Sequence, residues 1–203
     1  MRVGGIVLCG GKSTRMGISK ALLPFGPETM LQRIVRLVGE AVSPIVVVAA
    51  RDQELPALPP GMILTHDERE GQGPLEGIRA GLKALPPDVD AAYVTSCDVP
   101  LLKPAFVRRM IELLGDHSAV VPESAGWLHP LSAVYHRGVL PHVERLLATG
   151  RLRPVYLYDL VPTLRVQPAD LSAADADLQS LQNLNRPEDY RAALAKAGLV
   201  SAD

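Results

Sequence analysis

The segment that follows the first apolar run of the chain has the composition of a phosphate-binding loop. Residues 3–9 are apolar or glycine, and Gly10 and Gly11 come directly after them. Basic side chains follow at Arg15 and Lys20. A buried strand that opens into glycines exposes its backbone N–H groups, and the basic side chains bring positive charge to the same place. The segment therefore suits a polyphosphate.

Two better-known phosphate loops do not fit these residues. A Walker A loop would require a glycine at position 6, where the chain has Ile6. The dinucleotide-binding fingerprint also fails, because Gly10 and Gly11 are adjacent and no second glycine stands at the required offset. The remaining pattern is Gly-Gly-x-Ser-x-Arg-Met-Gly-x-x-Lys. The alternative interpretation is a glycine-rich turn with solvated basic residues.

A carboxylate follows a second apolar run, at residues 91–97. Pro100 prevents a strand there from continuing as a paired element, which leaves Asp98 at the carboxyl end of the strand. A carboxylate that faces a triphosphate is repelled unless a divalent cation lies between them, and Mg²⁺ is commonly held by one or two carboxylates plus phosphate oxygens. We therefore assign Asp98 to Mg²⁺. The alternative is an aspartate that caps the following turn.

Residues 67–77 could contribute to nucleotide binding. Gly73, Pro74 and Leu75 belong to a glycine-rich segment directly before a predicted helix, so the backbone can approach a flat ligand such as a nucleobase. Asp67 follows the predicted strand at residues 62–65 and could bind ribose or base. The alternatives are a plain loop that begins a helix and a solvated aspartate.

Three further polar residues are candidates for a binding site. His129 precedes a short predicted strand, and since no nucleophile stands near it, we assign it a substrate contact rather than catalysis. Asn183 and Asn185 flank one apolar residue before Pro187. In an extended segment, spacing of two residues turns both amides to the same side. The alternatives are a structural histidine and a helix-entry turn.

The elements that position these residues are read from apolar periodicity. Alternating strands and helices predict an α/β fold in which helices cross over between the strands of a mostly parallel central sheet. Ligands of such sheets bind outside the carboxyl ends of the strands. The predicted strands are residues 3–9, 45–49, 62–65, 91–97, 119–122, 131–135 and 164–166. The predicted helices are residues 30–42, with Thr29 as N-cap, 74–85, 104–114, 139–148 and 187–197. Residues 55–61 and 168–177 are predicted loops.

Composition limits the class of protein. A chain of 203 residues predicts a single domain, residues 1–203, with a sizeable core. A formal net charge of −1 gives no general attraction to nucleic acid. Without a secretory signal or a long apolar run, we expect a cytoplasmic protein with no membrane association. Cys9 and Cys97 are expected to be buried thiols, since their spacing suits neither a disulfide nor a zinc site.

Five motifs in order give the chain a resemblance to the molybdenum cofactor guanylyltransferase family. That family has a nucleotide-diphospho-sugar-transferase-like fold, which implies a three-layer, Rossmann-like architecture with helices on both faces of the sheet. The resemblance spans nearly the whole chain. The motifs are Leu8-Cys9-Gly10-Gly11 with Arg15-Met16-Gly17 and Lys20, Gly73-Pro74-Leu75-Glu76-Gly77, Ser96-Cys97-Asp98-Val99-Pro100, His129-Pro130, and Asn183-Leu184-Asn185-Arg186-Pro187-Glu188-Asp189.

The resemblance implies that a terminal phosphate of molybdopterin bearing molybdenum attacks the α-phosphorus of GTP, which gives molybdopterin guanine dinucleotide and pyrophosphate. It also implies a role for each matching residue. Leu8, Cys9, Gly10, Gly11 and Lys20 would contact GTP, Arg15 the phosphate tail, Asp67 the nucleotide, Asp98 the Mg²⁺, and Asn183 and Asn185 the pterin-bearing substrate. Because the nucleophile is already an anion, alignment and charge neutralisation by Arg15, Lys20 and Mg²⁺ suffice for catalysis. Other molybdenum cofactor synthesis proteins and molybdoenzyme apoproteins are the implied protein partners.

The chain departs from the family pattern at several positions. Ala50 stands where characterised guanylyltransferases have a nucleotide-binding asparagine, and Ser19 stands where an aspartate often precedes the lysine. Cys9 and Arg186 replace the usual alanine and threonine. Two alternatives keep the same loop and carboxylate: a molybdopterin cytidylyltransferase and a sugar-phosphate nucleotidyltransferase. An alternative from another class is a carrier protein that delivers molybdenum cofactor without catalysis.

Overall fold

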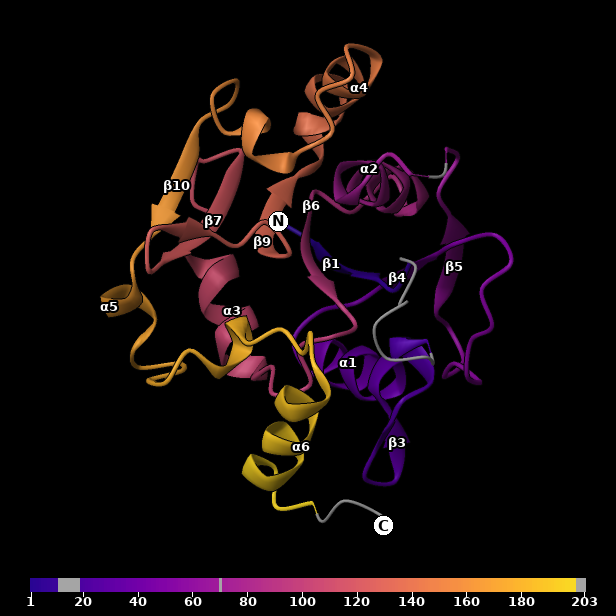
Figure 1. Cartoon of the computed structure of the whole chain (residues 1–203). Coiled ribbons are helices and arrows are strands. Elements are labelled where there is room, and N and C mark those ends of the chain that lie inside the picture. Colours follow the sequence, from indigo (N-terminus) through magenta and orange to yellow (C-terminus); the bar gives the residue numbers. More distant parts are fainter. Residues whose placement is uncertain (11–18, 70, 200–203) are drawn as a thin grey trace.

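One continuous sheet of eight strands runs through the middle of the protein, in the order β10-β7-β9-β6-β1-β4-β5, with β8 paired to β7. The computed structural model describes residues 1–10, 19–69 and 71–199. Helices α2 and α4 cover one face of the sheet, and α1 and α3 cover the other (Figure 1). The predicted three-layer α/β architecture is confirmed.

The observed elements follow the predicted order, with small shifts at their ends. The strands of the sheet are β1 (Val3–Leu8), β4 (Ile45–Ala49), β5 (Ile63–His66), β6 (Ala91–Ser96), β7 (Ala119–Ser124), β8 (Trp127–Leu128), β9 (Ser132–His136) and β10 (Thr163–Val166). A small hairpin is formed by β2 (Pro24–Phe25) and β3 (Glu28–Thr29). The α-helices are α1 (Met30–Gly39), α2 (Pro74–Ala84), α3 (Pro104–Glu112), α4 (Leu140–Ala148), α5 (Pro168–Leu171) and α6 (Pro187–Lys196). Short 3₁₀ turns are η1 (Lys20–Leu22), η2 (Arg137–Val139), η3 (Pro154–Leu157) and η4 (Gln179–Leu181).

Most of the sheet is parallel, and β9 is the main exception. β1 is parallel to β4 and β6, β4 to β5, and β7 to β10. β9 runs antiparallel to both β6 and β7, because the chain reaches it through the β7–β8 hairpin without a crossover helix. All parallel strands therefore end at one edge of the sheet, which we call the carboxyl edge.

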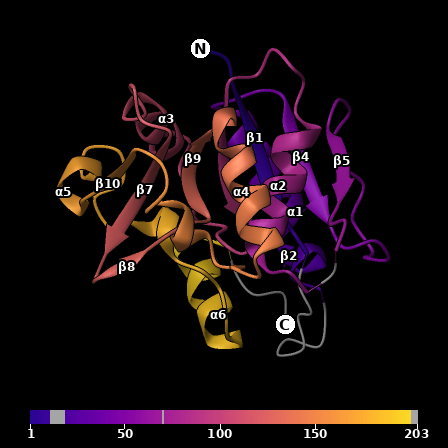
Figure 2. The same cartoon turned by 90° about the horizontal axis from the view of Figure 1, so that it is seen from above.

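Two apolar clusters, one on each face of the sheet, explain the continuous apolar runs in the strands. In β1, Ile6 and Leu8 belong to the cluster under α2 and α4, while Val7 belongs to the cluster over α1 and α3. A strand that is covered on both faces has no need of polar alternation. A third cluster joins α6 to the β2–β3 hairpin and to Leu101, which follows β6. Figure 2 shows α6 on the side toward which β4, β5 and β7 point.

Local capping explains where the first helix begins. Thr29 Oγ1 accepts a hydrogen bond from the backbone N–H of Gln32, and the side chain of Gln32 accepts one from the backbone N–H of Thr29. This capping box confirms Thr29 as the N-cap. The helix ends at Gly39 rather than at residue 42. The predicted loop at residues 168–177 is partly wrong, since Pro168 begins the one-turn helix α5.

Two glycines of α2 allow the helix to lie close to β1. An ideal Cβ at Gly81 would lie 2.5 Å from Cγ2 of Ile6, and one at Gly77 would lie 3.0 Å from Cδ2 of Leu8. Atoms of neighbouring side chains do not tolerate such approach in a packed core. The absence of a Cβ therefore sets the distance between α2 and β1, and with it the position of the loop before α2.

We expect Gly81→Ala to lower the free energy of unfolding by about 1–3 kcal/mol, because the added methyl overpacks the contact with Ile6. This loss should outweigh the higher helix propensity of alanine. Urea unfolding measures it, with Gly39→Ala as the control, since a Cβ there would meet only Ile45 Cδ1 at 3.4 Å. A Gly81→Ala variant as stable as the parent would contradict the close packing.

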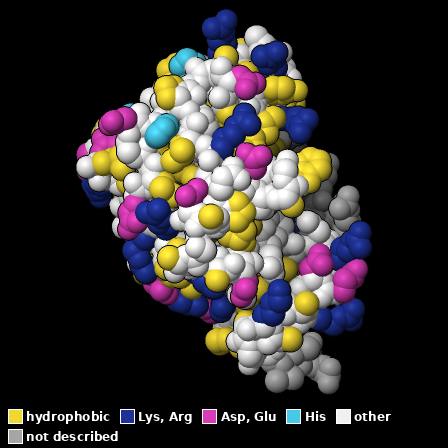
Figure 3. Space-filling model, turned by 90° about the vertical axis from the view of Figure 1, so that its left-hand side faces the viewer, with side chains coloured by type: hydrophobic (Ala, Val, Ile, Leu, Met, Phe, Trp, Pro, Cys, Tyr) yellow, Lys and Arg dark blue, Asp and Glu magenta, His cyan; other side chains and the backbone are white. Residues whose placement is uncertain are grey.

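Charge is dispersed over one side of the molecule. Figure 3 shows basic and acidic side chains interspersed over the face that carries β10 and α5.

Among the residues described, no helix combines the length and the apolarity that a membrane crossing requires.

Candidate active site

Polar side chains from three distant segments meet at the carboxyl edge, between the ends of β1 and β6. Lys20 Nζ lies 2.9 Å from Asp98 Oδ2 and donates a hydrogen bond of 3.2 Å to Asn185 Oδ1. Asn183 Nδ2 donates to Asp98 Oδ1 at 3.2 Å, and the hydroxyl of Ser96 donates to the same oxygen. We call Lys20, Asp98, Asn183 and Asn185 the edge cluster. The structure thus brings together four of the residues that the sequence singled out.

The register of two parallel strands puts Asp98 beside the end of β1. Leu8 of β1 is paired with Ser96 of β6, and the backbone N–H of Cys97 donates to the carbonyl oxygen of Leu8 at 3.0 Å. Leu8 and Ser96 are the last residues of their strands, so the two strands end side by side. Gly10 and Asp98 therefore follow neighbouring strand ends. The side chains of Lys20 and Asp98 are only 21% and 14% exposed. Solvent therefore screens this ion pair less than it screens a surface pair.

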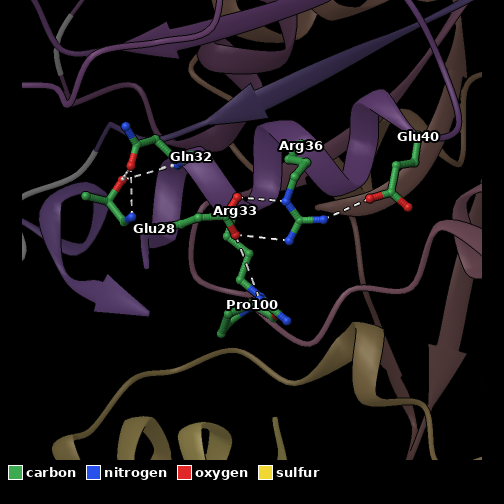
Figure 4. Close-up of polar contacts among 7 residues, drawn as sticks. Glu28, Gln32, Arg33, Arg36, Glu40 and Pro100 are labelled. Carbon is green, nitrogen blue, oxygen red and sulfur yellow. Dashed lines mark hydrogen bonds and ion pairs between the residues drawn. The ribbon is translucent and has the colours of Figure 1, made fainter. Parts of the chain in front are cut away.

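A side chain of helix α1 holds the loop that follows β6. Arg33 Nε donates to the carbonyl oxygen of Pro100 at 2.7 Å, as Figure 4 shows. The guanidinium of Arg33 also lies over the ring of Phe25, 4.8 Å from its centroid. On the same helix, Arg36 binds the carboxylates of Glu28 and Glu40. Helix α1 thereby holds the backbone two residues beyond Asp98.

The two asparagines point the same way, as period-two spacing predicts. Between them, Leu184 is buried in the third apolar cluster, and its backbone N–H donates to the carbonyl oxygen of Asp98 at 2.8 Å. Both neighbouring amides then reach the edge cluster, one at Asp98 and the other at Lys20. The pair therefore belongs to the same site as the Asp98 carboxylate.

Gly10 and Asp67 approach each other at the ends of β1 and β5. An ideal Cβ at Gly10 would lie 3.6 Å from Asp67 Oδ2 and 3.5 Å from the backbone nitrogen of Ala50. Gln53, which sequence reasoning missed, links this region. Its Nε2 donates to the carbonyl oxygen of Cys9 at 2.7 Å, and its Oε1 accepts from the N–H of Ala50 at 3.2 Å. The sequence offered one signal for Gln53: it is a side-chain amide three residues after Ala50, which stands where the family has an asparagine.

The segment before α2 is held by a buried carboxylate. Gly73 is the N-cap of α2 with φ of 68°, and Pro74 is its first residue, while the side chain of Leu75 is fully buried. Leu75 can therefore offer only its backbone to a ligand. Glu76 Oε1 accepts from the backbone N–H of Glu68 at 3.1 Å, next to Asp67. Helix α2 thus fixes the loop that carries Asp67.

The two cysteines are buried thiols, as expected from the sequence. Burial raises the pKa of Cys9 to about 12, and its Sγ donates to the carbonyl oxygen of Val48 at 3.2 Å. Burial also raises the pKa of Cys97 well above its ordinary value. Because the thiolate is the reactive form, burial disfavours reaction of both thiols at neutral pH. Gly11 and Arg15 lie outside the described residues, and their roles stay predictions.

His129 lies at the base of the β7–β8 hairpin. Its Nε2 is 2.7 Å from Ser124 Oγ, and its backbone N–H donates to the carbonyl oxygen of Pro122 at 2.9 Å. Burial lowers the pKa of this imidazole below its ordinary 6.5, which favours the neutral form. The ring therefore braces the hairpin, and its contact with substrate stays a prediction.

The lowered pKa of His129 predicts a dependence of stability on pH. Below about pH 6.5 the unfolded chain binds more protons at this residue than the folded chain does. We therefore expect stability to fall as the pH falls from about 6.5 toward 5, and His129→Gln to flatten that slope. Urea unfolding across this range measures both. An identical slope in the two proteins would contradict a buried, neutral imidazole.

Known proteins resemble this chain in sequence and in fold. A model of the MobA-like NTP transferase domain matches residues 5–163. The molybdenum cofactor guanylyltransferase of Desulfosudis oleivorans is 35% identical over an alignment of 203 positions that covers 98% of each chain.

Two solved structures share the fold at lower identity. Molybdopterin-guanine dinucleotide biosynthesis protein A of Archaeoglobus fulgidus has a TM-score of 0.78 at 21% identity, over 98% of this chain and 99% of the other. The 2-C-methyl-D-erythritol 4-phosphate cytidylyltransferase of Thermus thermophilus has a TM-score of 0.71 at 14% identity, over 96% and 98%. The match of the domain model over most of the chain, together with the identity to the Desulfosudis protein, shows that the chain belongs to the MobA-like NTP transferase family.

Proposed function

We propose that the protein transfers GMP from GTP to molybdopterin or the molybdenum cofactor, which gives molybdopterin guanine dinucleotide and releases pyrophosphate. The ion pair between Lys20 and Asp98 at the carboxyl edge carries this proposal, because it joins the cation and the carboxylate that a metal-assisted nucleotidyl transfer requires. Family membership and the guanylyltransferase name of the Desulfosudis relative support it. We further propose that residues 1–203 form one nucleotidyltransferase domain, which the continuous sheet supports.

Asp98 fits Mg²⁺ better than a metal with an all-protein ligand set. The described part of the chain holds no group of three or more His, Cys, Asp or Glu side chains that could bind a metal ion. Mg²⁺ is instead commonly bound by one or two carboxylates together with substrate phosphates. Bound there, Mg²⁺ would neutralise charge on the triphosphate and polarise the α-phosphate. Asp98 would hold it from the protein side.

Lys20 is suited to bind the triphosphate. Its ammonium carries three N–H donors, and among the described residues two of them bind Asp98 and Asn185. The third is left for a phosphate oxygen, with a charge-assisted hydrogen bond. The proposed nucleophile is an anionic phosphate, so no side chain has to remove a proton from it. The protein contributes alignment and positive charge.

The candidate residues divide into a nucleotide side and an acceptor side. We propose that Gly10, Asp67 and the backbone of residues 73–75 bind the nucleoside. A Cβ at Gly10 would lie 3.6 Å from Asp67 Oδ2, and Glu76 of α2 binds the backbone of Glu68 next to Asp67. Asn183 and Asn185 contact Asp98 and Lys20, and we propose that the pterin-bearing substrate binds beside them. Ala50 stands at the position of the family's nucleotide-binding asparagine. The side-chain amide nearest to it in sequence is that of Gln53, which we propose as its substitute on the nucleotide side.

A product assay with purified protein, Mg²⁺ and molybdopterin tests the proposed function. We expect pyrophosphate and the guanine dinucleotide with GTP, and much slower turnover with CTP or UTP. Equal or faster turnover with CTP would replace the assignment by a cytidylyltransferase, and turnover of a sugar phosphate alone by a sugar-phosphate nucleotidyltransferase. Binding of molybdopterin with no pyrophosphate release from any nucleotide would indicate a carrier.

A further inference from the structure

Asp175 is a buried carboxylate in the segment between α5 and α6, away from the reacting groups described above. Its side chain is completely buried, and its Oδ1 lies 2.7 Å from Nζ of Lys103. Its Oδ2 accepts a hydrogen bond of 2.7 Å from the backbone N–H of Ser180. The backbone N–H of Lys103 in turn donates to Ser180 Oγ at 3.0 Å. A carboxylate is rarely buried unless it is paired and hydrogen-bonded, as this one is.

The turn that Asp175 closes contains an unfavourable backbone conformation. Leu178 has φ of 48° and ψ of 38°, a left-handed backbone conformation that residues other than glycine and asparagine seldom adopt. The N–H of Leu178 donates to the carbonyl oxygen of Asp175 at 3.0 Å. Such a residue persists only where its surroundings impose the conformation. The bonds of Asp175 to Lys103 and Ser180 supply that constraint.

The same turn leads directly into the edge cluster. Leu181 is buried against the sheet, and Asn183 and Leu184 follow within three residues. Leu184 then bonds to the backbone of Asp98. Lys103 is the N-cap of α3 and stands five positions after Asp98. Lys103 therefore links the loop of Asp98 to the segment of the two asparagines, with Asp175 as the shared anchor.

We propose that Asp175 is a positioning residue that holds Asn183 and Asn185 against Asp98 and Lys20. It touches no reacting group and acts through the turn of residues 175–181. The consequence for catalysis rests on the proposed function, in which the two asparagines face the acceptor. The consequence for the backbone does not, because the hydrogen bond from Leu184 to Asp98 exists whatever the substrate.

Asp175→Asn tests this role, with Asp177→Asn as the matched control, since Asp177 is an exposed aspartate in the same segment. Hydrogen exchange followed by mass spectrometry should show faster exchange in peptides covering residues 179–186 of Asp175→Asn, and unchanged exchange in β1 and β6. The KM for molybdopterin should rise roughly tenfold, by analogy with the loss of a group that orients a metal ligand. The KM for GTP should stay within about twofold of the parent value, because the nucleotide side is untouched.

A double-mutant cycle separates positioning from general stabilisation. If Asp175 acts through Asn183, Asp175→Asn should add little to the loss caused by Asn183→Ala. Additive losses, or a lower melting temperature with unchanged exchange at residues 179–186, would overturn the proposal. If Asp175→Asn does not fold, Ser180→Ala takes its place and should change exchange in the same direction, and no change there would also overturn it. A parent protein without turnover would refute the proposed function, while the exchange experiment would still decide the role of Asp175.

Discussion

Asp98→Asn should slow pyrophosphate release by roughly 10³-fold, in the range found when a group that stabilises transition-state charge is removed. Asparagine has nearly the same shape as aspartate, and its carbonyl oxygen can still accept from Ser96 or Asn183. The carboxylate charge that pairs with Lys20 at 2.9 Å is lost, and with it the proposed ligand of Mg²⁺. GTP binding should largely survive, because backbone groups and Lys20 remain. Steady-state turnover and calorimetric GTP binding measure the two effects.

The control for this variant is Asp116→Asn, an exposed aspartate beyond the end of α3. It changes the formal charge of the protein by the same amount and should leave turnover unchanged. A turnover of Asp98→Asn above about a tenth of the parent value would be too high for a metal ligand. That result would remove Asp98 from the reaction and leave it as a cap of the turn after β6.

Arg79→Met should lower the free energy of unfolding by about 3–5 kcal/mol, because it leaves the carboxylate of Glu76 buried without its counter-charge. Glu76 is 2% exposed, and Arg79 donates to its two oxygens at 2.9 and 2.7 Å. For a chain of this size the melting temperature should fall by roughly 10 °C. Thermal unfolding followed by circular dichroism, together with urea unfolding, measures the change.

Two further variants identify the cause of that loss. Glu68→Ala removes the other carboxylate that binds Arg79. The Glu68 side chain is 58% exposed, so its loss should cost far less stability than Arg79→Met does. Replacing both members of the buried pair, Glu76→Leu with Arg79→Met, should recover much of the stability, since no unpaired charge is left. An Arg79→Met variant within about 1 kcal/mol of the parent would mean that Glu76 takes up a proton or reaches water.

The strands, their order along the chain and the edge of the sheet that binds ligand follow from local patterns. A strand covered on both faces needs a continuous apolar run, so β1, β4 and β6 were visible within a few residues of their true ends. The antiparallel direction of β9 is harder to predict, because the apolar pattern of residues 131–135 carries no information about the direction in which the strand runs. What reverses the chain is the short hairpin at Ala125 and Gly126, both with positive φ.

The contacts within the site were only partly predictable. The types of Lys20, Asp98 and the two asparagines suggested a common site, but their mutual hydrogen bonds span up to 165 positions and depend on the packing of α6. The roles of Gln53 and Asp175 depend on which backbone groups come near their side chains. No local periodicity carries that information. The one-turn helix α5 was missed because its small and polar residues are equally typical of a loop.

The most direct test of the central claim is a crystal structure with a non-hydrolysable GTP analogue and Mn²⁺, which replaces Mg²⁺ and gives an anomalous signal. We predict an anomalous peak bonded to the Asp98 carboxylate and to a phosphate oxygen, with Lys20 Nζ on the triphosphate. A triphosphate bound away from Asp98, or a Mn²⁺ peak elsewhere with none at Asp98, would contradict the account.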